Sequence, residues 1–359
     1  MMYGNYGDNV LIFLSFFVTA YFFQKINFLP QITTSSIGER YYFLDGLRGI
    51  CAIFVVITHS HELLGLKGFN LTEYGPNSIS FLGIIGVQMF FCITGFLFID
   101  QLIKKNYNID WITFFSSRIK RLLPLFFFSI TMSLIIIYII NFNKLNTLSL
   151  DDVKNSLGLY FLKQNEILGI NSNHLLGATW TLPYEWRFYM ALPLFCAFVN
   201  LIKVNPIILF SIFGVFVGKY FLIGCFSALL FNKYKIKNNL ARVITLLLAI
   251  SSLVILSSSK DVNGNDVFIF SFILFLGLVM SPPDFLSKKI YVYCGEISYS
   301  IYLLHMPLMF FITYLSYFLF GVTKLNNYNF IFVYSISSIL ICIISFFSYK
   351  YIEYPFLKK

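Results

Sequence analysis

The sequence predicts an all-α integral membrane protein, a polytopic bundle of about 11 transmembrane helices. Hydrophobic residues make up 58% of the 359 residues and charged residues only 12%, whereas a soluble domain contains about 25% charged residues. Apolar stretches long enough to cross a bilayer recur along the chain, and most basic residues lie in the short connections between them. Water cannot cover so much apolar surface, so lipid is the expected solvent.

The predicted spans follow from the length of each apolar stretch, since a bilayer core requires about 20 apolar residues per helix. The segments are 9–24, 46–64, 81–101, 122–141, 180–202, 205–217, 219–232, 240–258, 267–281, 295–319 and 330–351. The pieces 205–217 and 219–232 are short and could together form one helix. Lys219 and the glycines Gly214, Gly218 and Gly224 favour a break between them.

The basic residues also predict how the chain is oriented. With the N-terminus outside, 18 of the 26 Lys and Arg residues fall in inner loops, 7 fall outside, and Arg187 lies within a span. An inner excess of this kind favours an outer N-terminus and a cytoplasmic C-terminus. The first apolar stretch, 10–23, lacks a basic leading region and a small-residue cleavage site, so we expect an uncleaved helix.

The net charge of +10 does not predict nucleic-acid binding, because the basic residues serve topology in short loops. The cysteines all lie in or beside apolar stretches, and none forms a CxxC pair. Neither a disulfide framework nor a metal site is expected. These cysteines are Cys51, Cys92, Cys196, Cys225, Cys294 and Cys342.

Arg48 and His59 are the first pair of polar residues expected at membrane depth. They are eleven residues apart, about three helical turns, so they project from nearly one face about 16 Å apart along the axis. A cation at the cytoplasmic edge suits a phosphorylated ligand, and a deeper imidazole suits proton transfer. The alternative is a snorkelling arginine and a hydrogen-bonded core histidine.

Glu185 is predicted to lie about 7 Å below an outer edge near Trp180, with Tyr189 one turn further in. A carboxylate at that depth needs a partner, so an ion pair that only joins two helices is the alternative. His305 is predicted to lie about 15 Å from the cytoplasmic start of its span, with Ser298 and Tyr302 on its face.

These counts place His59, Glu185 and His305 at comparable depths on three helices, as a buried reaction chamber would require. Transporters place such groups at the midplane as well, so depth alone does not separate an enzyme from a transporter.

A basic segment precedes the fourth predicted span, in FFSSRIKRLLPLF. We expect it to be an inner loop in which Arg118 and Arg121, three residues apart, grip one phosphate group. The alternative is that these charges only set topology. We expect His174 to be an interfacial residue of an outer loop and Asp45 to be an N-terminal helix cap.

Several motifs in one order resemble the acyltransferase-3 family of membrane-bound O-acyltransferases. Arg48 and His59 match its Arg/Lys-x10-His signature, and Arg118 and Arg121 its RxxR pattern. The similarity covers residues 41 to about 356. The other matching segments are GVQMFFCITGFLFI, TWTLPYEWRFY, YFLIGCFSALL, CGEISYSIYLLHMPL and IEYPF.

The resemblance implies a ten-helix core with both ends inside, so residues 1–40 would be an additional N-terminal helix with an inner loop and 41–359 the acyltransferase domain. It implies a bacterial-type inner (plasma) membrane enzyme. That enzyme would transfer an acyl group, with acetyl expected, from cytoplasmic acyl-CoA to a hydroxyl of a surface polysaccharide or lipid-linked sugar. The expected partners are acyl-CoA, the glycan acceptor and membrane lipid, with no nucleic acid and no metal.

The same resemblance suggests roles for individual residues. Arg48, Arg118 and Arg121 would receive the CoA phosphates. His59 would be a general base or a transient acyl carrier, with Glu185 and His305 as further catalytic residues. The expected substrate-binding residues are Trp180, Tyr189, Ser298 and Tyr302. A transporter or flippase of lipid-linked oligosaccharide and a polysaccharide polymerase remain the competing predictions.

Overall fold

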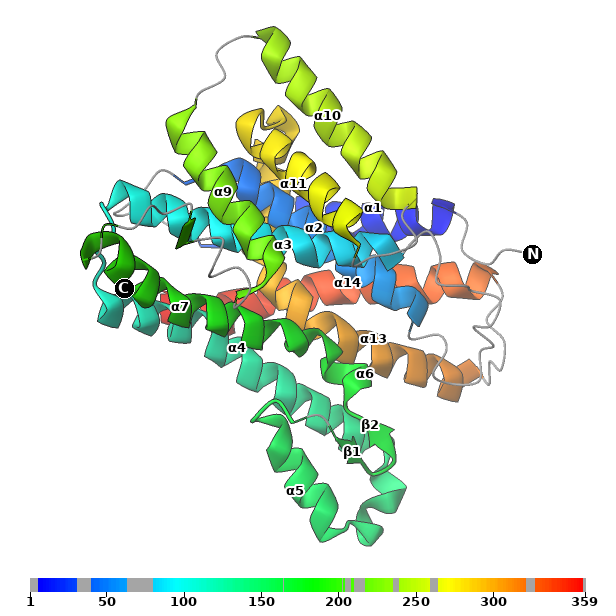
Figure 1. Ribbon diagram of the computed structural model, residues 1–359. Helices are drawn as coiled ribbons and strands as arrows, with labels where there is room; N and C mark the ends of the chain where they lie inside the picture. Colours follow the sequence, from blue (N-terminus) through cyan, green and yellow to red (C-terminus); the bar gives the residue numbers. More distant parts are fainter. Residues whose placement is uncertain are drawn as a thin grey trace.

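The structure, a computed structural model, describes residues 6–30, 40–62, 80–163, 165–201, 203, 208–209, 217–234, 239–258, 264–320 and 327–357. Within these residues it is almost wholly helical (Figure 1), as predicted, with one two-stranded hairpin of β1 (Glu166–Ile167) and β2 (Ile170–Asn171). The α-helices are α1 (Tyr6–Lys25), α2 (Tyr42–Glu62), α3 (Ser80–Lys104), α4 (Trp111–Ile140), α5 (Leu150–Leu159), α6 (Asn173–Leu176), α7 (Leu182–Leu201), α9 (Lys219–Lys233), α10 (Asn239–Ser258), α11 (Asn265–Met280), α12 (Lys289–Glu296), α13 (Ser298–Phe320), α14 (Asn327–Ser348) and α15 (Tyr354–Leu357).

Each predicted span except 205–217 coincides with a described helix. The span 205–217 lies almost wholly outside the described residues, so the count of eleven stays a prediction. Six of the described helices are long and apolar enough to cross a membrane, and α11 and most of α1 form shorter apolar helices. The six segments are Tyr42–Ser60, Phe81–Lys104, Trp111–Ile140, Asn239–Ser257, Ser298–Ser316 and Phe332–Leu357.

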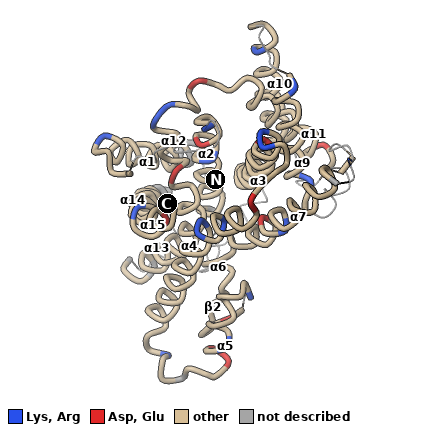
Figure 2. The backbone as a smooth tube through the Cα atoms, turned by 90° about the vertical axis from the view of Figure 1, so that its left-hand side faces the viewer, with Lys and Arg blue, Asp and Glu red and all other residues tan. Residues whose placement is uncertain are grey.

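The outer surface of the bundle has the character expected of a lipid-facing surface. In α10 only 17% of the apolar window is buried, and Leu247 and Val254 are 59% and 62% exposed. Figure 2 shows that most of the helical length carries no charge. Exposed apolar area on this scale would aggregate in water, so the chain is an integral membrane protein.

The backbones of α3 and α9 are in direct contact at two glycines, Gly95 of α3 and Gly224 of α9. A Cβ on Gly224 would lie 2.0 Å from the carbonyl oxygen of Cys92, and one on Gly95 would lie 2.3 Å from that of Phe221. Small residues allow helices to approach this closely in a membrane, where dispersion rather than the hydrophobic effect drives association. The contact fixes α3, which lines the site described below.

The end of the bundle where α2 begins contains a break between helices that the sequence did not predict. The span 295–319 was expected to begin near Gly295, but α12 ends at Glu296 and α13 begins at Ser298. A Cβ on Gly295 would lie 2.0 Å from the carbonyl oxygen of Asp45, so α12 packs directly on the first turn of α2. This contact sets the position at which α13 enters the bundle.

Two local predictions near the starts of α2 and α4 are wrong. Arg118 and Arg121 lie on α4 rather than in a loop, because the helix starts at Trp111, where the Asp110 side chain accepts a hydrogen bond from the Ile112 N–H at 3.0 Å. Asp45 lies inside the first turn of α2 and forms an ion pair with Arg40 at 2.7 Å instead of capping the helix.

The longest predicted outer loop is an ordered excursion between α4 and α7. It contains the 3-10 helix Phe142–Thr147, α5, the β1–β2 hairpin, α6 and the 3-10 helix Gly177–Thr181. Asp152 joins its parts, since its carboxylate accepts from the Ser149 N–H at 3.0 Å and from the Leu168 N–H at 2.8 Å. In Figure 1 the excursion projects beside the far end of α4.

Candidate active site

A cavity of about 810 Å³ lies among α2, α3, α4, α7 and the α12–α13 junction. Its lining includes Arg48, Arg118, Arg121, Glu185 and Tyr189, five of the residues singled out in the sequence. Ser298 and Tyr302 line it as well. The packing of α2 against α3, α12 and α13 therefore brings residues from across the chain to one enclosed space.

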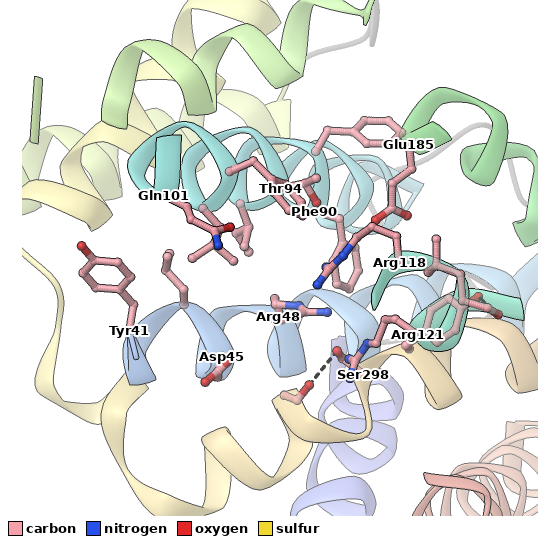
Figure 3. A pocket seen from close by; sticks show the side chains of 18 of the residues that line it. Tyr41, Asp45, Arg48, Phe90, Thr94, Gln101, Arg118, Arg121, Glu185 and Ser298 are labelled. Carbon is pink, nitrogen blue, oxygen red and sulfur yellow. Dashed lines mark hydrogen bonds between the residues drawn. The ribbon is translucent and has the colours of Figure 1, made fainter. Parts of the chain in front are cut away.

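Three arginines face this space (Figure 3). Arg48 comes from α2, while Arg118 and Arg121 come from the first turns of α4. Among the described residues none of the three forms an ion pair, and the Arg118 guanidinium lies 5.1 Å from the centre of the Phe98 ring. Glu353 lies near enough to Arg121, and Glu185 near enough to Arg48, to attract them electrostatically. With no described carboxylate at ion-pair distance, the planar guanidinium donors stay available to a bound anion such as phosphate.

The mouth of the cavity carries a second polar cluster that sequence reasoning missed. Asp100 is only 4% exposed, and its carboxylate accepts from the Tyr41 hydroxyl at 3.1 Å and from the Asn232 amide at 2.9 Å. Lys104 lies 3.0 Å from the same carboxylate. The one feature of the sequence that could have indicated this cluster is Asp100 itself, a single acidic residue at the end of an apolar stretch.

Arg40 closes the other side of the mouth. It pairs with Asp45 and with Glu296, joining the start of α2 to the end of α12. Burial alone would lower the pKa of Arg40, but the two carboxylates outweigh burial and raise it. This side of the mouth therefore has two carboxylates for one guanidinium, so Arg40 adds no net positive charge to the cavity. The positive charge deeper in the cavity comes from Arg48, Arg118 and Arg121.

The carboxylate of Glu185 enters the cavity from α7 (Figure 3). It accepts a hydrogen bond from the Tyr189 hydroxyl one turn further along the helix. The Tyr302 hydroxyl donates to Thr181 Oγ1 at 3.2 Å, and the Ser298 hydroxyl donates to the Gly295 carbonyl at 2.7 Å. Glu185 is therefore held by a tyrosine, and no ion pair that would make it a purely structural group is found among the described residues.

His59 and His305 face each other, with ring centres 5.2 Å apart. His305 is fully buried, and its Nδ1 lies 3.1 Å from the Ile301 carbonyl, so Nδ1 is the protonated nitrogen of the neutral ring. Its Nε2 has no hydrogen-bond partner among the described atoms. Neither histidine lines the cavity, but the Tyr302 ring, which does, lies 6.1 Å from that of His305.

His59, Glu185 and His305 were predicted to lie together. In the structure they lie in two separate places. The two histidines adjoin each other, and Glu185 lies with the arginines. Trp180 lies elsewhere: its side chain is 51% exposed and packs on Phe91 with ring centres 6.3 Å apart.

A family model described as "Acyltransferase domain", that of the acyltransferase-3 family, matches residues 41–218 and 219–348. The chain belongs to the acyltransferase-3 family. The prediction of family and of an acyltransferase enzyme is confirmed, and membership of this family favours a transferase over the competing transporter and polymerase functions.

Two similar proteins are the O-acetyltransferases OatA of Staphylococcus aureus strains NCTC 8325 and COL. Each is 25% identical over 369 residues, which cover 88% of this chain and 57% of the relative. The chain therefore spans little more than half the length of these relatives. No solved structure matches it.

The acyltransferase-3 chain described here contains no group of three or more His, Cys, Asp or Glu side chains able to hold a metal ion within its described residues. The cavity supplies anion-binding groups and the histidine pair supplies bases.

Proposed function

We propose that this membrane acyltransferase moves an acetyl group from acetyl-CoA to a hydroxyl of a surface polysaccharide or lipid-linked sugar. The observation that carries the proposal is the set of three arginines, without ion-pair partners among the described residues, in a cavity of about 810 Å³. A CoA ester is a polyphosphate joined to a long neutral arm, and a cationic cavity that leads toward buried imidazoles suits both parts.

Arg48, Arg118 and Arg121 would bind the phosphates, and the pantetheine arm would run between α2 and α13 toward Tyr302. The relatives named as O-acetyltransferases support acetyl as the group transferred. Ser298 and Tyr302 would lie along the arm, since both line the cavity. Trp180, which is outside it, would act only at its edge.

In the transfer itself, His59 would take the proton from the acceptor hydroxyl as the hydroxyl oxygen attacks the thioester carbonyl. The carbon–sulfur bond then breaks, and the CoA thiolate leaves and takes up the proton. His305 would assist from its position beside His59, and the Tyr189–Glu185 pair would orient the reacting groups. The alternative, in which His59 carries the acetyl group transiently, uses the same arrangement.

We further propose eleven spans with the N-terminus outside and the C-terminus cytoplasmic, residues 1–40 being an added helix and loop and 41–359 the catalytic domain. The distribution of Lys and Arg supports this orientation. The packing of Leu286 on Gly46 supports it as well, since both residues are predicted on the inner side. The enzyme would lie in a bacterial-type plasma membrane, with its donor inside and its acceptor outside.

Substitution of Arg118 and Arg121 tests this proposal. Replacing Arg118 and Arg121 with Gln removes two charge-assisted donors, each worth roughly 1.5–3 kcal/mol. We expect the KM for acetyl-CoA to rise at least 100-fold, measured as labelled acetyl transferred by the purified protein in proteoliposomes. Lys120→Gln is the matched control, because Lys120 is exposed on the same helix and does not line the cavity. An unchanged KM in the double variant would exclude the phosphate-binding role.

A further inference from the structure

A second hollow, of about 660 Å³, lies beside the C-terminal end of α4 and the middle of α13. Asn141 follows the last residue of α4, Asn143 belongs to the 3-10 helix Phe142–Thr147, Asn171 to the β1–β2 hairpin and His174 to α6. Its volume falls within the range of about 300–1,000 Å³ that is usual for small-molecule sites. No motif in the sequence points to it, and the acetyl-CoA proposal does not use it. We call it the outer hollow.

The chemistry of the outer hollow differs from that of the inner cavity. The inner cavity is lined by six Lys or Arg residues and four Asp or Glu residues, whereas the outer hollow has one of each sign, Lys144 and Glu166. Its remaining polar side chains are neutral amides, an imidazole and a phenol. Side-chain amides both donate and accept hydrogen bonds, so they match a ligand with many hydroxyl groups better than an anion.

Aromatic rings form the inner wall of the outer hollow. Phe310 and Tyr314 line it from α13, and the His174 ring lies nearly parallel to that of Phe310, at 3° with centres 6.4 Å apart. Burial lowers the pKa of His174, which keeps the imidazole neutral at neutral pH and able both to donate and to accept. Flat apolar rings beside neutral hydrogen-bonding groups suit the two kinds of surface on a sugar ring.

The position of the outer hollow connects it to the histidine pair. Along α13, Tyr302 lines the inner cavity and Phe310 lines the outer hollow, a separation of about 12 Å at 1.5 Å per residue. His305 lies between them, fully buried and next to His59. The short segment from α6 to Thr181 also links the two sites, since His174 lines the outer hollow and Thr181 lines the inner cavity.

We propose that the outer hollow binds an uncharged sugar unit of the acceptor and delivers one of its hydroxyls toward the histidine pair. This inference rests on the proposed function, which supplies the acetyl group from the opposite side. The sugar unit belongs either to a finished surface polysaccharide or to a lipid-linked precursor. The recognising groups are Asn143, Asn171 and His174, and the aromatic wall is Phe310 and Tyr314.

The test is the double variant Asn143→Ala/His174→Ala in the full-length protein, reconstituted in proteoliposomes with labelled acetyl-CoA. One acceptor is the host's surface polysaccharide freed of O-acetyl groups by mild alkali, and the other is the host's extracted lipid-linked sugar fraction. Losing two neutral hydrogen bonds should raise the KM for the true acceptor about 5- to 30-fold. The KM for acetyl-CoA should stay unchanged, and the acceptor whose KM rises identifies the source.

Asn146→Ala is the matched control, since Asn146 is exposed on the same 3-10 helix but does not line the outer hollow. His174→Gln keeps hydrogen-bonding groups and should recover part of the lost affinity, which a merely unstable protein would not do. An acceptor KM within twofold of wild type for both acceptors would overturn the site. A wild-type protein that transfers no acetyl to either acceptor would instead overturn the proposed function.

Discussion

At the scale of single residues, the histidine pair is the proposed centre of the chemistry. The Nδ1 of His305 forms a hydrogen bond with the Ile301 carbonyl, and its Nε2 has no hydrogen-bond partner among the described atoms. A buried nitrogen of this kind costs free energy unless a substrate or an intermediate uses it. His59 lies beside it and is partly accessible. The pair therefore combines a partly accessible imidazole, that of His59, with the buried imidazole of His305, whose Nε2 has no hydrogen-bond partner among the described atoms.

Replacing His59 with Asn should lower kcat for acetyl transfer by about 100- to 10,000-fold, the range that a general base contributes. Acetyl-CoA binding, measured by calorimetry on the same reconstituted protein, should remain at the wild-type affinity because the three arginines lie in the cavity and not at the pair. A kcat within tenfold of wild type would remove His59 from the catalytic step.

At the scale of elements, the carboxylate of Asp152 joins the parts of the excursion between α4 and α7. Asp152 belongs to the capping box of α5 and also accepts the Leu168 N–H from the hairpin. That hydrogen bond, with those from Ser149, lowers the pKa of Asp152 below its ordinary value of 3.8. Because the folded pKa lies below the unfolded one, the stabilisation is complete above about pH 4 and disappears as the pH falls through the folded pKa.

Amide hydrogen exchange over 150–171 should therefore accelerate below about pH 4, after correction for intrinsic rates, while exchange in α2 and α13 stays slow. Asp152→Asn should show the faster exchange already at neutral pH. Asp151→Asn should behave like the wild type, because Asp151 is exposed and pairs only with Lys154 at 3.4 Å. Equal exchange in Asp152→Asn and wild type at pH 7 would contradict this role.

At the scale of the whole molecule, the two hollows lie at different levels along the same helices. Along α4, Arg121 precedes Asn141, which caps the C-terminal end of the helix, and along α13, Ser298 precedes Phe310. A bundle with this arrangement suits a reaction whose donor and acceptor are on different sides of a membrane. The proposed orientation assigns the arginine end to the cytoplasm.

Cysteine labelling tests that orientation. The six native cysteines are buried, so a membrane-impermeant maleimide should label introduced residues selectively. Asn146→Cys should react in intact spheroplasts, whereas Ser287→Cys should react only after permeabilisation. Both positions are exposed in the structure. The reverse pattern would invert the topology, and labelling of both from outside would mean that the number of crossings between them is not the one predicted.

Most of the fold could be predicted because each helix is encoded by its own apolar stretch, as α3 and α14 illustrate. The arginines of the cavity could also be anticipated, since Arg118 and Arg121 lie close together in the chain. The Asp100–Tyr41 contact and the outer hollow could not be predicted, because they depend on how distant segments pack. The break at Ile297 was missed for a different reason: α12 ends at Glu296 and α13 begins at Ser298, so a single residue separates the two helices and no loop marks the boundary in the sequence.

The full burial of His305 between the two hollows has a consequence for the cell's energy supply. Leu304 and Met306, its neighbours in α13, are buried as well, so at this level of α13 packed side chains separate the two hollows, with His59 the partly accessible neighbour. Crossing a packed apolar layer is costly for any charge. In the proposed enzyme this layer would limit the leakage of protons, so that acyl transfer need not dissipate the proton gradient on which the cell depends.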